Sequence, residues 1–421
     1  MNVALTTPDL AERTRTHRLG LARRLRDHLR DKTSDLADGV LRTDPRIYLD
    51  EERFKAEQQK IFKETPLVAC LSTDVENPGD FFTFDDTGVP ILVVRSRDGR
   101  VRAFLNVCPH RGARLVRDPS GRASRFTCWF HAWTFATDGK LLAAPERERF
   151  GAELDDCNHL TELPSAERHG FVFVIATPGK PLDLDDHLGD FAEQIDYLGL
   201  QGMVPVKSTL MTAKSNWKYI LDTFYEGYHL SSMHQTTLFP NYRSDTHIYD
   251  IYGPHFRFLN VARHIEKWLL NSAEAEWPID YQLTGSNYIF PNTYVTAAPK
   301  PALSDSSGGC FYAVFRLFPG DTVGETKIYL TLYGPREDLS PEYREQIDAI
   351  CAAMVHLLTS EDFTMAEEAW LGLSAIPAGQ RLLVGPQERL VQELELSIAE
   401  RIGLPLPAPE PVRPSERRNN G

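Results

Sequence analysis

Two short segments constrain the fold of this chain more than any other feature, because each pairs a cysteine with a histidine. Cys108 and His110 lie in the pattern C-P-H, and Cys128 and His131 lie in the pattern C-W-F-H. Between His110 and Cys128 there are 17 residues. Thiolates and imidazoles are both metal ligands. Because each segment offers one of each, each could contact both metals of a small cluster.

Two cysteines on one iron and two histidines on the other are the ligands of a Rieske [2Fe–2S] centre. The same four residues could also hold structural zinc. Zinc fingers, however, usually keep both cysteines in one half of the motif and both histidines in the other. The mixed halves favour the iron cluster over zinc and over four unrelated core residues. Strand patterns at residues 104–107 and 125–127 predict that the ligands lie on loops that follow short strands.

Length and composition limit the class of protein. A chain of 421 residues can form two domains. A net charge of -13 argues against a general nucleic-acid binder, and we expect neither a membrane span nor a signal peptide. The remaining cysteines have no paired spacing, so we expect buried thiols and a cytoplasmic protein. These cysteines are Cys70, Cys157, Cys310 and Cys351.

The order of local patterns predicts four parts. A charged helical segment at residues 1–44 is expected to pack on the catalytic domain or on a neighbouring subunit. Residues 45–165 are expected to form a small β-domain: a helix is predicted at residues 50–62, and period-two patterns from about residue 66 to 142 predict short strands, with a hairpin that turns at residues 97–100. Residues 166–403 mix helices and strands and form a second domain, in which residues 216–234 are expected to be helical. Residues 404–421 contain five prolines and are expected to be a disordered tail.

A second candidate metal site lies in the second domain, where His229 and His234 follow the acids Asp222 and Glu226. Positions five apart on an ideal helix point about 140° away from each other. The two histidines therefore converge only if the helix ends or widens between them. Two histidines and one carboxylate form the facial triad of non-haem Fe(II) oxygenases. The carboxylate could be Asp222, Glu226 or a distant acid such as Asp362, and the alternative is that both histidines are ordinary surface or core residues.

With both sites considered, the chain resembles the α (terminal oxygenase) subunit of Rieske non-haem iron ring-hydroxylating oxygenases. The resemblance runs from about residue 44 to residue 402. Its motifs are C-P-H-R-G with C-x-x-H, N-W-K at 216–218, E-G-Y-H-x4-H at 226–234, F-P-N at 290–292 and E-D at 361–362. It implies an α+β fold: a β-rich Rieske [2Fe–2S] domain plus a START-like (helix-grip) catalytic domain with an antiparallel sheet.

The resemblance also implies roles for individual residues. It makes Cys108, His110, Cys128 and His131 the cluster ligands. It makes the mononuclear iron ligands His229, His234 and Asp362.

Glu226 would be the bridge that carries electrons to His229 from His131 of a neighbouring subunit, in a homotrimer. The family usually has Asp at this position, and Glu occurs in members that resemble carnitine oxygenases, which cleave a C–N bond. Asp222 stands where the family commonly has Asn, which makes it a candidate substrate-pocket residue.

The implied function is that of a terminal oxygenase that inserts oxygen from O2 into a small organic substrate by hydroxylation or oxidative demethylation. An aromatic compound is the first candidate substrate. Electrons would come from NAD(P)H through a reductase, a ferredoxin or both, and a β subunit is a further candidate partner. The alternatives are an oxygenase that cleaves a C–N bond of a quaternary ammonium substrate, and a non-enzymatic Rieske electron carrier. Aromatic candidates for the pocket are Phe224, Tyr228, Phe256, Phe258, Tyr288 and Tyr294.

The loop between the cluster ligands is rich in arginine although the protein is acidic. Such a cluster could attract an acidic electron-donor protein, or its members could pair with local acids. The five residues are Arg111, Arg114, Arg117, Arg122 and Arg125.

Overall fold

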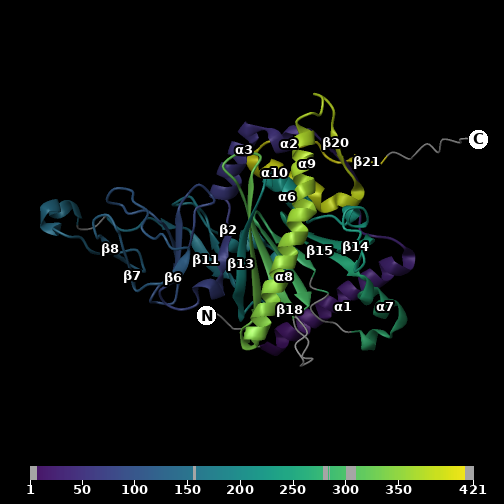
Figure 1. Ribbon diagram of the computed structural model, residues 1–421, viewed down its shortest axis with the longest axis horizontal. Coiled ribbons are helices and arrows are strands. Elements are labelled where there is room, and N and C mark those ends of the chain that lie inside the picture. Colours follow the sequence, from purple (N-terminus) through teal and green to yellow (C-terminus); the bar gives the residue numbers. More distant parts are fainter. Residues whose placement is uncertain (1–6, 155–157, 278–282, 284, 300–309, 413–421) are drawn as a thin grey trace, which may run out of the picture.

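The computed structural model describes residues 7–154, 158–277, 283, 285–299 and 310–412. The molecule is elongated, with a smaller β-rich lobe at one end and a larger lobe built on a long sheet at the other (Figure 1). The predicted α+β class, a β-rich domain plus a helix-grip domain with an antiparallel sheet, is confirmed.

The smaller lobe contains two sheets. One has five strands in the order β10-β5-β4-β3-β6, and the other has three in the order β7-β8-β9. Their bounds are β3 (Asp80–Phe84), β4 (Ile91–Arg95), β5 (Val101–Leu105), β6 (Ser120–Arg122), β7 (Arg125–Thr127), β8 (Thr134–Ala136), β9 (Leu141–Ala143) and β10 (Glu162–Leu163). The predicted hairpin is present: β4 and β5 pair antiparallel, and the register ends at Arg95 opposite Val101. Helix η3 (Arg147–Leu154) follows β9.

A third sheet lies where the two lobes meet, as Figure 1 shows. Its order is β11-β12-β2, with bounds β2 (Leu67–Leu71), β11 (Ser165–Arg168) and β12 (Phe171–Val174). Every residue of β2 and β12 is buried. Strands buried on both faces read as continuous apolar runs, and the sequence of β12, F-V-F-V, is such a run.

The larger lobe is built on a seven-stranded sheet in which all neighbouring strands pair antiparallel. In spatial order its strands are β13 (Met203–Ala213), β19 (Thr326–Pro335), β18 (Cys310–Pro319), β17 (Thr293–Pro299), β16 (Ser286–Ile289), β15 (His255–Ala262) and β14 (Tyr242–Tyr252). Helices α8 (Pro341–Ser360) and α9 (Asp362–Leu373) run across one face of this sheet (Figure 1). Helix α8 begins where the Ser340 side chain accepts a hydrogen bond from the Tyr343 N–H.

The helix predicted over residues 216–234 is much shorter than expected, which corrects that prediction. Helix α6 (Trp217–Asp222) begins at Asn216, whose side chain accepts a hydrogen bond from Lys218 N–H, and ends after six residues. A turn follows, and the short 3-10 helix η4 (Tyr228–Ser231) starts after Gly227. The helix therefore ends before both histidines, which is the condition under which they can converge.

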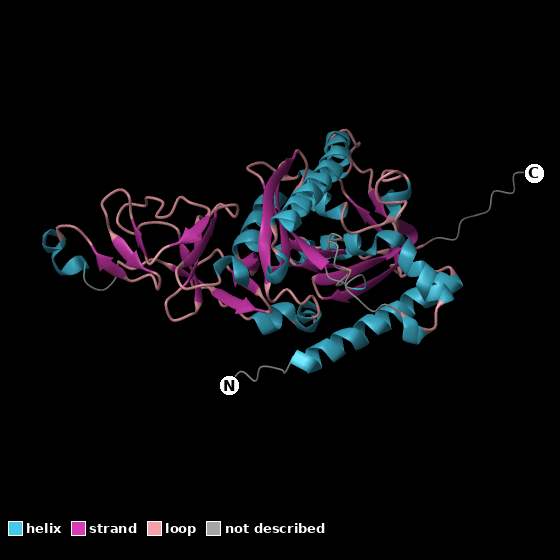
Figure 2. Cartoon of the chain, turned by 60° about the horizontal axis from the view of Figure 1, so that its bottom comes forward, coloured by secondary structure: helices cyan, strands magenta, loops and turns pink. Residues whose placement is uncertain are grey.

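The N-terminal segment lies against the larger lobe. Helix α1 (Thr7–Asp31) packs on α7 (Arg263–Asn271) and β14, along the outer side of the lobe (Figure 2). Helix α2 (Arg46–Leu49) contacts α3 (Glu51–Glu57), and α3 contacts η1 (Gln58–Lys63). Both α3 and η1 contact α10 (Arg389–Ile402). Residues 46–63 were expected to belong to the β-domain, and instead they pack on the C-terminal helix of the larger lobe.

Part of the expected disordered tail is held in a sheet. Strand β1 (Gly39–Thr43) pairs with β20 (Leu382–Val384) and with β21 (Glu410–Pro411). Residues 413–421 of this expected tail lie outside the described residues. The remaining short helices are η2 (Ser72–Val75), α4 (Leu184–Leu188), α5 (Phe191–Asp196), η5 (Glu274–Glu276), η7 (Arg336–Asp338) and η8 (Pro386–Glu388).

Within the described ranges, no helix is long and apolar enough to cross a membrane. Cys70 and Cys351 are buried and form no disulfide, as expected, and Cys310 is also buried. Cys157 lies outside the described residues.

Candidate functional site

The first ligand loop is a tight turn between β5 and β6. The Cys108 N–H donates to the carbonyl of Ala113 at 2.8 Å, and the Gly112 N–H donates to the carbonyl of Cys108 at 2.9 Å. Gly112 has a φ of 75°, in the left-handed region that glycine adopts without strain.

The second loop repeats this turn between β7 and β8. The Cys128 N–H donates to the carbonyl of Trp133 at 2.7 Å, and the Ala132 N–H donates to the carbonyl of Cys128 at 2.9 Å. Ala132, at the position of the glycine in the first loop, also has a positive φ, of 57°. Both loops therefore present a cysteine and a histidine from the same backbone frame.

The four predicted cluster ligands come together at the tips of these loops. Cys108 and Cys128 are each only 2% exposed, and the rings of His110 and His131 meet edge to face with centroids 4.7 Å apart. Burial and the neighbouring Cys128 thiol raise the pKa of the Cys108 thiol. Burial, His131 and Arg111 lower the pKa of His110. A neutral imidazole is the form that binds metal.

The spacing of these ligands suits a two-metal cluster better than a single zinc ion. Among the described residues, the only group of three or more His, Cys, Asp or Glu with all ligand atoms within 4.8 Å of one another is elsewhere in the chain. No three of the four loop ligands therefore surround one point, as a tetrahedral zinc site requires. Two buried sulfurs and two nitrogens spread over a wider space fit a Rieske [2Fe–2S] cluster.

Exposed aromatic side chains and arginines surround the cluster loops. Trp129 is 60% exposed and Phe130 is 46% exposed. The guanidinium of Arg117 lies 3.9 Å from the centroid of the Trp129 ring, and that of Arg111 lies 5.3 Å from that of Phe130. We call Arg111, Arg117, Trp129 and Phe130 the cluster-side patch.

The other loop arginines differ in their partners. Arg114 pairs with Asp85, and Arg122 pairs with Asp80 at 2.5 Å. Arg125 is exposed. Two of these arginines therefore pair with local acids, whereas Arg111 and Arg117 stack on exposed aromatic rings.

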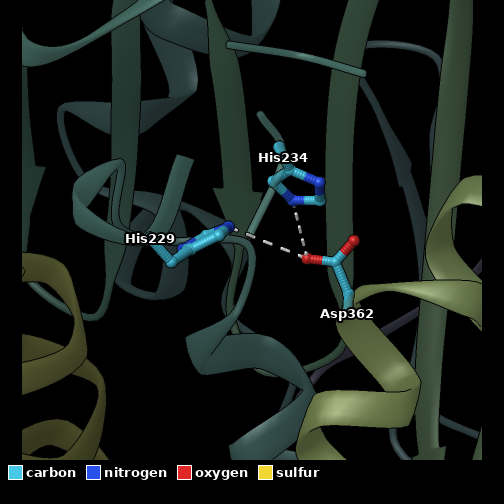
Figure 3. Close-up of side chains that lie close together, drawn as sticks. All are labelled: His229, His234 and Asp362. Carbon is cyan, nitrogen blue, oxygen red and sulfur yellow. Dashed lines mark ion pairs between the residues drawn. The ribbon is translucent and has the colours of Figure 1, made fainter. Parts of the chain in front are cut away.

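The second candidate site is formed by His229, His234 and Asp362, whose ligand atoms all lie within 4.8 Å of one another. One oxygen of Asp362 faces both rings: Oδ1 lies 3.8 Å from His229 Nε2 and 3.3 Å from His234 Nε2 (Figure 3). His229 belongs to η4, His234 follows it, and Asp362 begins α9. His234 is 1% exposed and Asp362 is 3% exposed.

A carboxylate holds the other nitrogen of each histidine. Glu226 contacts Nδ1 of His229, and Glu361 contacts Nδ1 of His234. Such outer carboxylates fix the tautomer and ring orientation of metal-binding histidines. They leave Nε2 of both rings directed at the space beside Asp362.

The charge around His234 fits a cation-binding site. Burial lowers the pKa of His234, but the carboxylates of Asp362 and Glu361 raise it, and their effect is larger in sum. Two imidazole nitrogens and one carboxylate oxygen form the ligand set of non-haem Fe(II), which leaves positions for other ligands. The residues present therefore fit a mononuclear iron.

Asp222 lies outside this triad. Its Oδ2 accepts a hydrogen bond from the Tyr48 hydroxyl at 2.7 Å, and its Oδ1 is buried without a hydrogen-bond partner among the described residues. Burial and the charge of Glu395 raise the pKa of Asp222. Neither Tyr48 nor Glu395 could be recognised from the sequence, because each lies far from Asp222 along the chain.

The aromatic candidates separate into two groups. Tyr228 is 64% exposed and lies on the surface. The rings of Phe224 and Tyr294 lie 5.3 Å apart, and those of Phe256 and Tyr288 lie 4.8 Å apart. Phe258 is buried beside Tyr249.

Tyr225, which was not among the candidates, connects the two ring pairs. Its ring centroid lies 4.6 Å from that of Phe256 and 5.9 Å from that of Tyr294. Its hydroxyl is buried without a hydrogen-bond partner among the described residues. Nothing in the local pattern marked Tyr225 beyond its place between Phe224 and Glu226.

Comparisons with known proteins match both halves of the chain. The model of the Rieske [2Fe-2S] domain matches residues 65–164, and that of the ring hydroxylating alpha subunit (catalytic domain) matches residues 200–404. The chain is 33% identical over 203 residues to the chlorobenzene dioxygenase subunit alpha of Cupriavidus sp. (strain PS12), which is 45% of this chain and 44% of that subunit. It is 29% identical over 193 residues to the glycine betaine monooxygenase oxygenase subunit of Pseudomonas aeruginosa, which is 46% and 44%. The matched segments span less than half of each relative's length.

Solved structures share the fold over most of the chain. The quaternary ammonium Rieske monooxygenase CntA in complex with L-carnitine superposes with a TM-score of 0.71 at 21% identity, covering 86% of this chain and 96% of that one. Naphthalene 1,2-dioxygenase with bound indole gives a TM-score of 0.65 at 20% identity, covering 87% and 93%.

Proposed function

Because the chain belongs to the family of Rieske ring-hydroxylating oxygenase α subunits, we propose that it is the terminal oxygenase of a multicomponent system. It inserts oxygen from O2 into a small organic substrate, with electrons from NAD(P)H that arrive through a reductase, a ferredoxin or both. The carrying observation is that one chain has two separate ligand sets, a Cys2His2 pair of loops and a His2Asp triad with free positions. An electron carrier alone has no use for the second set.

When bound, the cluster supplies single electrons and the mononuclear iron binds and activates O2. Cys108, His110, Cys128 and His131 hold the cluster. In the catalytic domain, Glu226 and Glu361 keep the histidines in the tautomer that directs Nε2 inward.

We further propose that the two sites of one chain work with those of its neighbours. The cluster loops flank β7 and β8 at the far end of the molecule, away from the helices α6 and α9 near the triad (Figure 1). Glu226, already bound to His229, then accepts a hydrogen bond from the partner subunit's His131 and provides the path for the electron. A head-to-tail arrangement of this kind closes into a ring, and we propose a homotrimer.

For the substrate, the proposal is an aromatic compound that is hydroxylated or oxidatively demethylated. Aromatic ring pairs inside the catalytic domain support this, because one of their members, Tyr294, is affected by the charge of Asp362. Relatives named for chlorobenzene and naphthalene support it as well. Asp222 is proposed as the polar residue on the edge of this pocket.

A quaternary ammonium substrate with C–N cleavage is the second candidate. Two observations favour it: Glu rather than Asp stands at the bridging position 226, and a relative is named a glycine betaine monooxygenase. Aromatic rings also bind quaternary ammonium groups through cation–π contacts.

Electron delivery requires a donor protein. The exposed arginines and aromatic rings of the cluster-side patch support docking of an acidic donor beside the cluster. An accompanying β subunit is a further proposed partner.

Metal analysis and oxygen uptake test the proposal together. We expect about three irons and two sulfides per chain, and O2 consumption that depends on substrate. The panel contains aromatic acids, methyl ethers and trimethylammonium compounds, and products are identified by mass. Two irons without substrate-dependent uptake would instead indicate an electron carrier, and zinc without sulfide would exclude both.

A further inference from the structure

We propose that Asp222 and Glu395 together retain one proton inside the catalytic domain at neutral pH, and that this carboxyl pair supplies protons to the oxygen chemistry at the triad. The second half of this inference rests on the proposed oxygenase function. The first half concerns the protein alone and can be tested without turnover.

Both carboxyl groups have buried oxygens without a hydrogen-bond partner among the described residues, although Asp222 is partly exposed and its Oδ2 accepts from Tyr48. Glu395 lies on α10 and is 0% exposed, and neither of its oxygens has a hydrogen-bond partner among the described residues. Asp222 is the last residue of α6, and its Oδ1 is also buried and without a partner in the described part of the chain. Buried, unpaired carboxylate oxygens carry a large desolvation cost, which a bound proton removes.

The charges around the pair leave one negative charge uncompensated. Arg53 and Lys218 are the buried cations of this region, and both already contact the buried carboxylate of Glu57. Lys218 Nζ lies 2.6 Å from Glu57 Oε1, whereas Arg53 Nη2 lies 3.9 Å from Glu395 Oε2. Three carboxyl groups therefore face two cations, so one proton neutralises the group.

None of the other polar groups that face the pair supplies a positive charge. The Tyr48 hydroxyl from α2 donates to Asp222. Burial and the charges of Asp222 and Glu388 raise the pKa of Tyr219. The charge of Glu388 also raises the pKa of Asp222, so Glu388 adds negative charge to this region. From the sheet, Tyr288 faces both carboxyl groups, and its own hydroxyl donates to the carbonyl of Pro291.

The electrostatics agree with the geometry. Burial, followed by the charge of Glu395, raises the pKa of Asp222 well above its usual value. Burial raises the pKa of Glu395 to about 7, although Lys218 and Arg53 lower it. A carboxyl group with such a pKa is partly protonated at neutral pH.

Tyr225 offers a route from the pair toward the triad. Its buried hydroxyl has no partner among the described residues, and the charge of Asp222 is among the factors that raise its pKa. The Tyr225 ring contacts that of Tyr294. Tyr294 in turn is affected by the carboxylate of Asp362. Burial is the main cause that raises the pKa of Tyr294 to about 12, and the charge of Asp362 raises it further.

Oxygen insertion consumes protons in the same number as the electrons that the donor protein delivers. In the proposed step, the O–H bond of the carboxyl pair breaks and a water molecule carries its proton to the Tyr225 hydroxyl, which has no hydrogen-bond partner among the described residues. The Tyr225 hydroxyl passes its own proton to the oxygen that is being reduced. The pair is then a carboxylate and regains a proton from solvent before the next turnover.

Infrared difference spectroscopy tests whether the pair holds a proton. We compare the carboxylic acid C=O stretch at neutral pH between the wild type and the variants Asp222→Asn and Glu395→Gln. Either substitution alone leaves two carboxylates facing two cations, so we expect the band of the shared proton to be lost in both. The control is Glu393→Gln, a half-buried position on the same helix whose carboxylate pairs with Arg389 at 3.7 Å, and it should keep the band. A band that persists in both test variants would overturn the inference.

Product yield tests whether this proton is used. With a donor protein and a substrate found in the oxygen-uptake panel, we expect Asp222→Asn and Glu395→Gln to form several-fold less product per O2 and to release more hydrogen peroxide. Glu393→Gln should behave as the wild type. Loss of the infrared band with unchanged product yield and unchanged solvent isotope effect would refute proton supply. A wild type that consumes no O2 with any substrate would refute the proposed function, while the infrared result would still decide whether the pair holds a proton.

Discussion

At the scale of the single residue, two carboxylates decide which nitrogen of each triad histidine faces the metal site. Glu226 contacts His229 and Glu361 contacts His234, both at Nδ1. Glu361 is held in turn by the Thr237 hydroxyl at 2.8 Å. Glu226 also accepts the N–H of His229 at 3.1 Å. The two acids thus do the same local work, but only Glu226 is proposed to connect to a neighbouring subunit.

This difference predicts distinct phenotypes. Glu226→Ala and Glu361→Ala should both weaken iron binding at the triad by about 10- to 100-fold, because each removes a carboxylate that orients one of the histidines. When iron is supplied in excess so that both variants are loaded, only Glu226→Ala should slow the substrate-dependent reoxidation of the reduced cluster, by about 10-fold or more. Glu361→Ala, the matched control, should reoxidise at the wild-type rate. Stopped-flow absorbance follows the cluster, and metal analysis gives the iron. Wild-type turnover by Glu226→Ala would show that the bridge is assigned to the wrong residue.

The buried carboxyl of Glu395 predicts a pH dependence of stability. Its pKa rises from 4.5 in the unfolded chain to about 7 in the fold, so the folded state binds the proton more tightly. The contribution is fully present below about pH 4.5 and is lost as the pH rises through about 7, with a magnitude of about 3 kcal/mol at most. Glu395→Gln should therefore unfold at a less pH-dependent temperature across this window. Equal slopes of melting temperature against pH in variant and wild type would contradict the raised pKa.

Residues that act through sequence-local patterns were predictable, and residues that act across the fold were not. The two Cys–His segments could be recognised from their spacing alone, and the fold brings their rings and thiols together. Asp362 could be chosen only through the family resemblance, because a long stretch of chain separates it from His234. Glu395 and Tyr48 could not be found, since their contact with Asp222 depends on how α2, α6 and α10 pack.

At the scale of the element, the two ligand loops are copies of one turn with one difference. The first has Gly112 at the left-handed position, and the second has Ala132 there. An L-residue in this conformation costs roughly 1–2 kcal/mol. No heavy atom lies within 4 Å of a Cβ added to Gly112, so the backbone conformation alone decides the cost of an alanine at that position.

The paired loops allow a reciprocal exchange. Gly112→Ala should lower the free energy of unfolding of the cluster domain by about 1 kcal/mol, and Ala132→Gly should raise it by less, because glycine also gains entropy in the unfolded chain. Thermal melts followed by cluster absorbance report both changes. Destabilisation of similar size by both substitutions would mean that side-chain contacts, rather than backbone conformation, govern the loops.

Hairpins were predicted better than helix ends. The turn between β4 and β5 is determined by the residues of the turn itself, whereas the early end of α6 depends on contacts with residues that are distant along the chain. Lys218 and Trp217 both bond to Glu57 on α3, and Asp222 bonds to Tyr48. These anchors tie α6 to the N-terminal helices over its short length, so tertiary contacts override the helical pattern of the following residues.

At the scale of the whole molecule, a positively charged patch lies on the surface of a protein whose net charge is negative. The protein carries a net charge of -13, yet Arg111 and Arg117 sit on exposed rings beside the cluster. A local positive patch steers an oppositely charged partner even when the net charge is negative. The two-lobe plan was predictable from sequence, but the packing of residues 46–63 on the larger lobe was not, because their contacts with α10 join opposite ends of the chain.

The patch predicts salt-sensitive electron delivery. Reduction of the cluster by its donor should slow as salt rises, and Arg111→Ala with Arg117→Ala should reduce both the rate and its dependence on salt several-fold. Arg122→Ala is the control, because that side chain is occupied by Asp80. Reduction kinetics that stay constant from low to high salt would argue that the patch has another use.

The long shape of the chain has a consequence for how its activity should be assayed. The cluster loops and the triad occupy opposite lobes (Figure 1). Under the proposed path between subunits, the cluster of an isolated protomer could be reduced, but its electron could not reach the triad of the same chain. Specific activity should then fall when the protein is diluted below the concentration at which protomers separate, while the colour of the reduced and oxidised cofactor stays the same. Sedimentation measured over the same dilution series would show both transitions at one concentration.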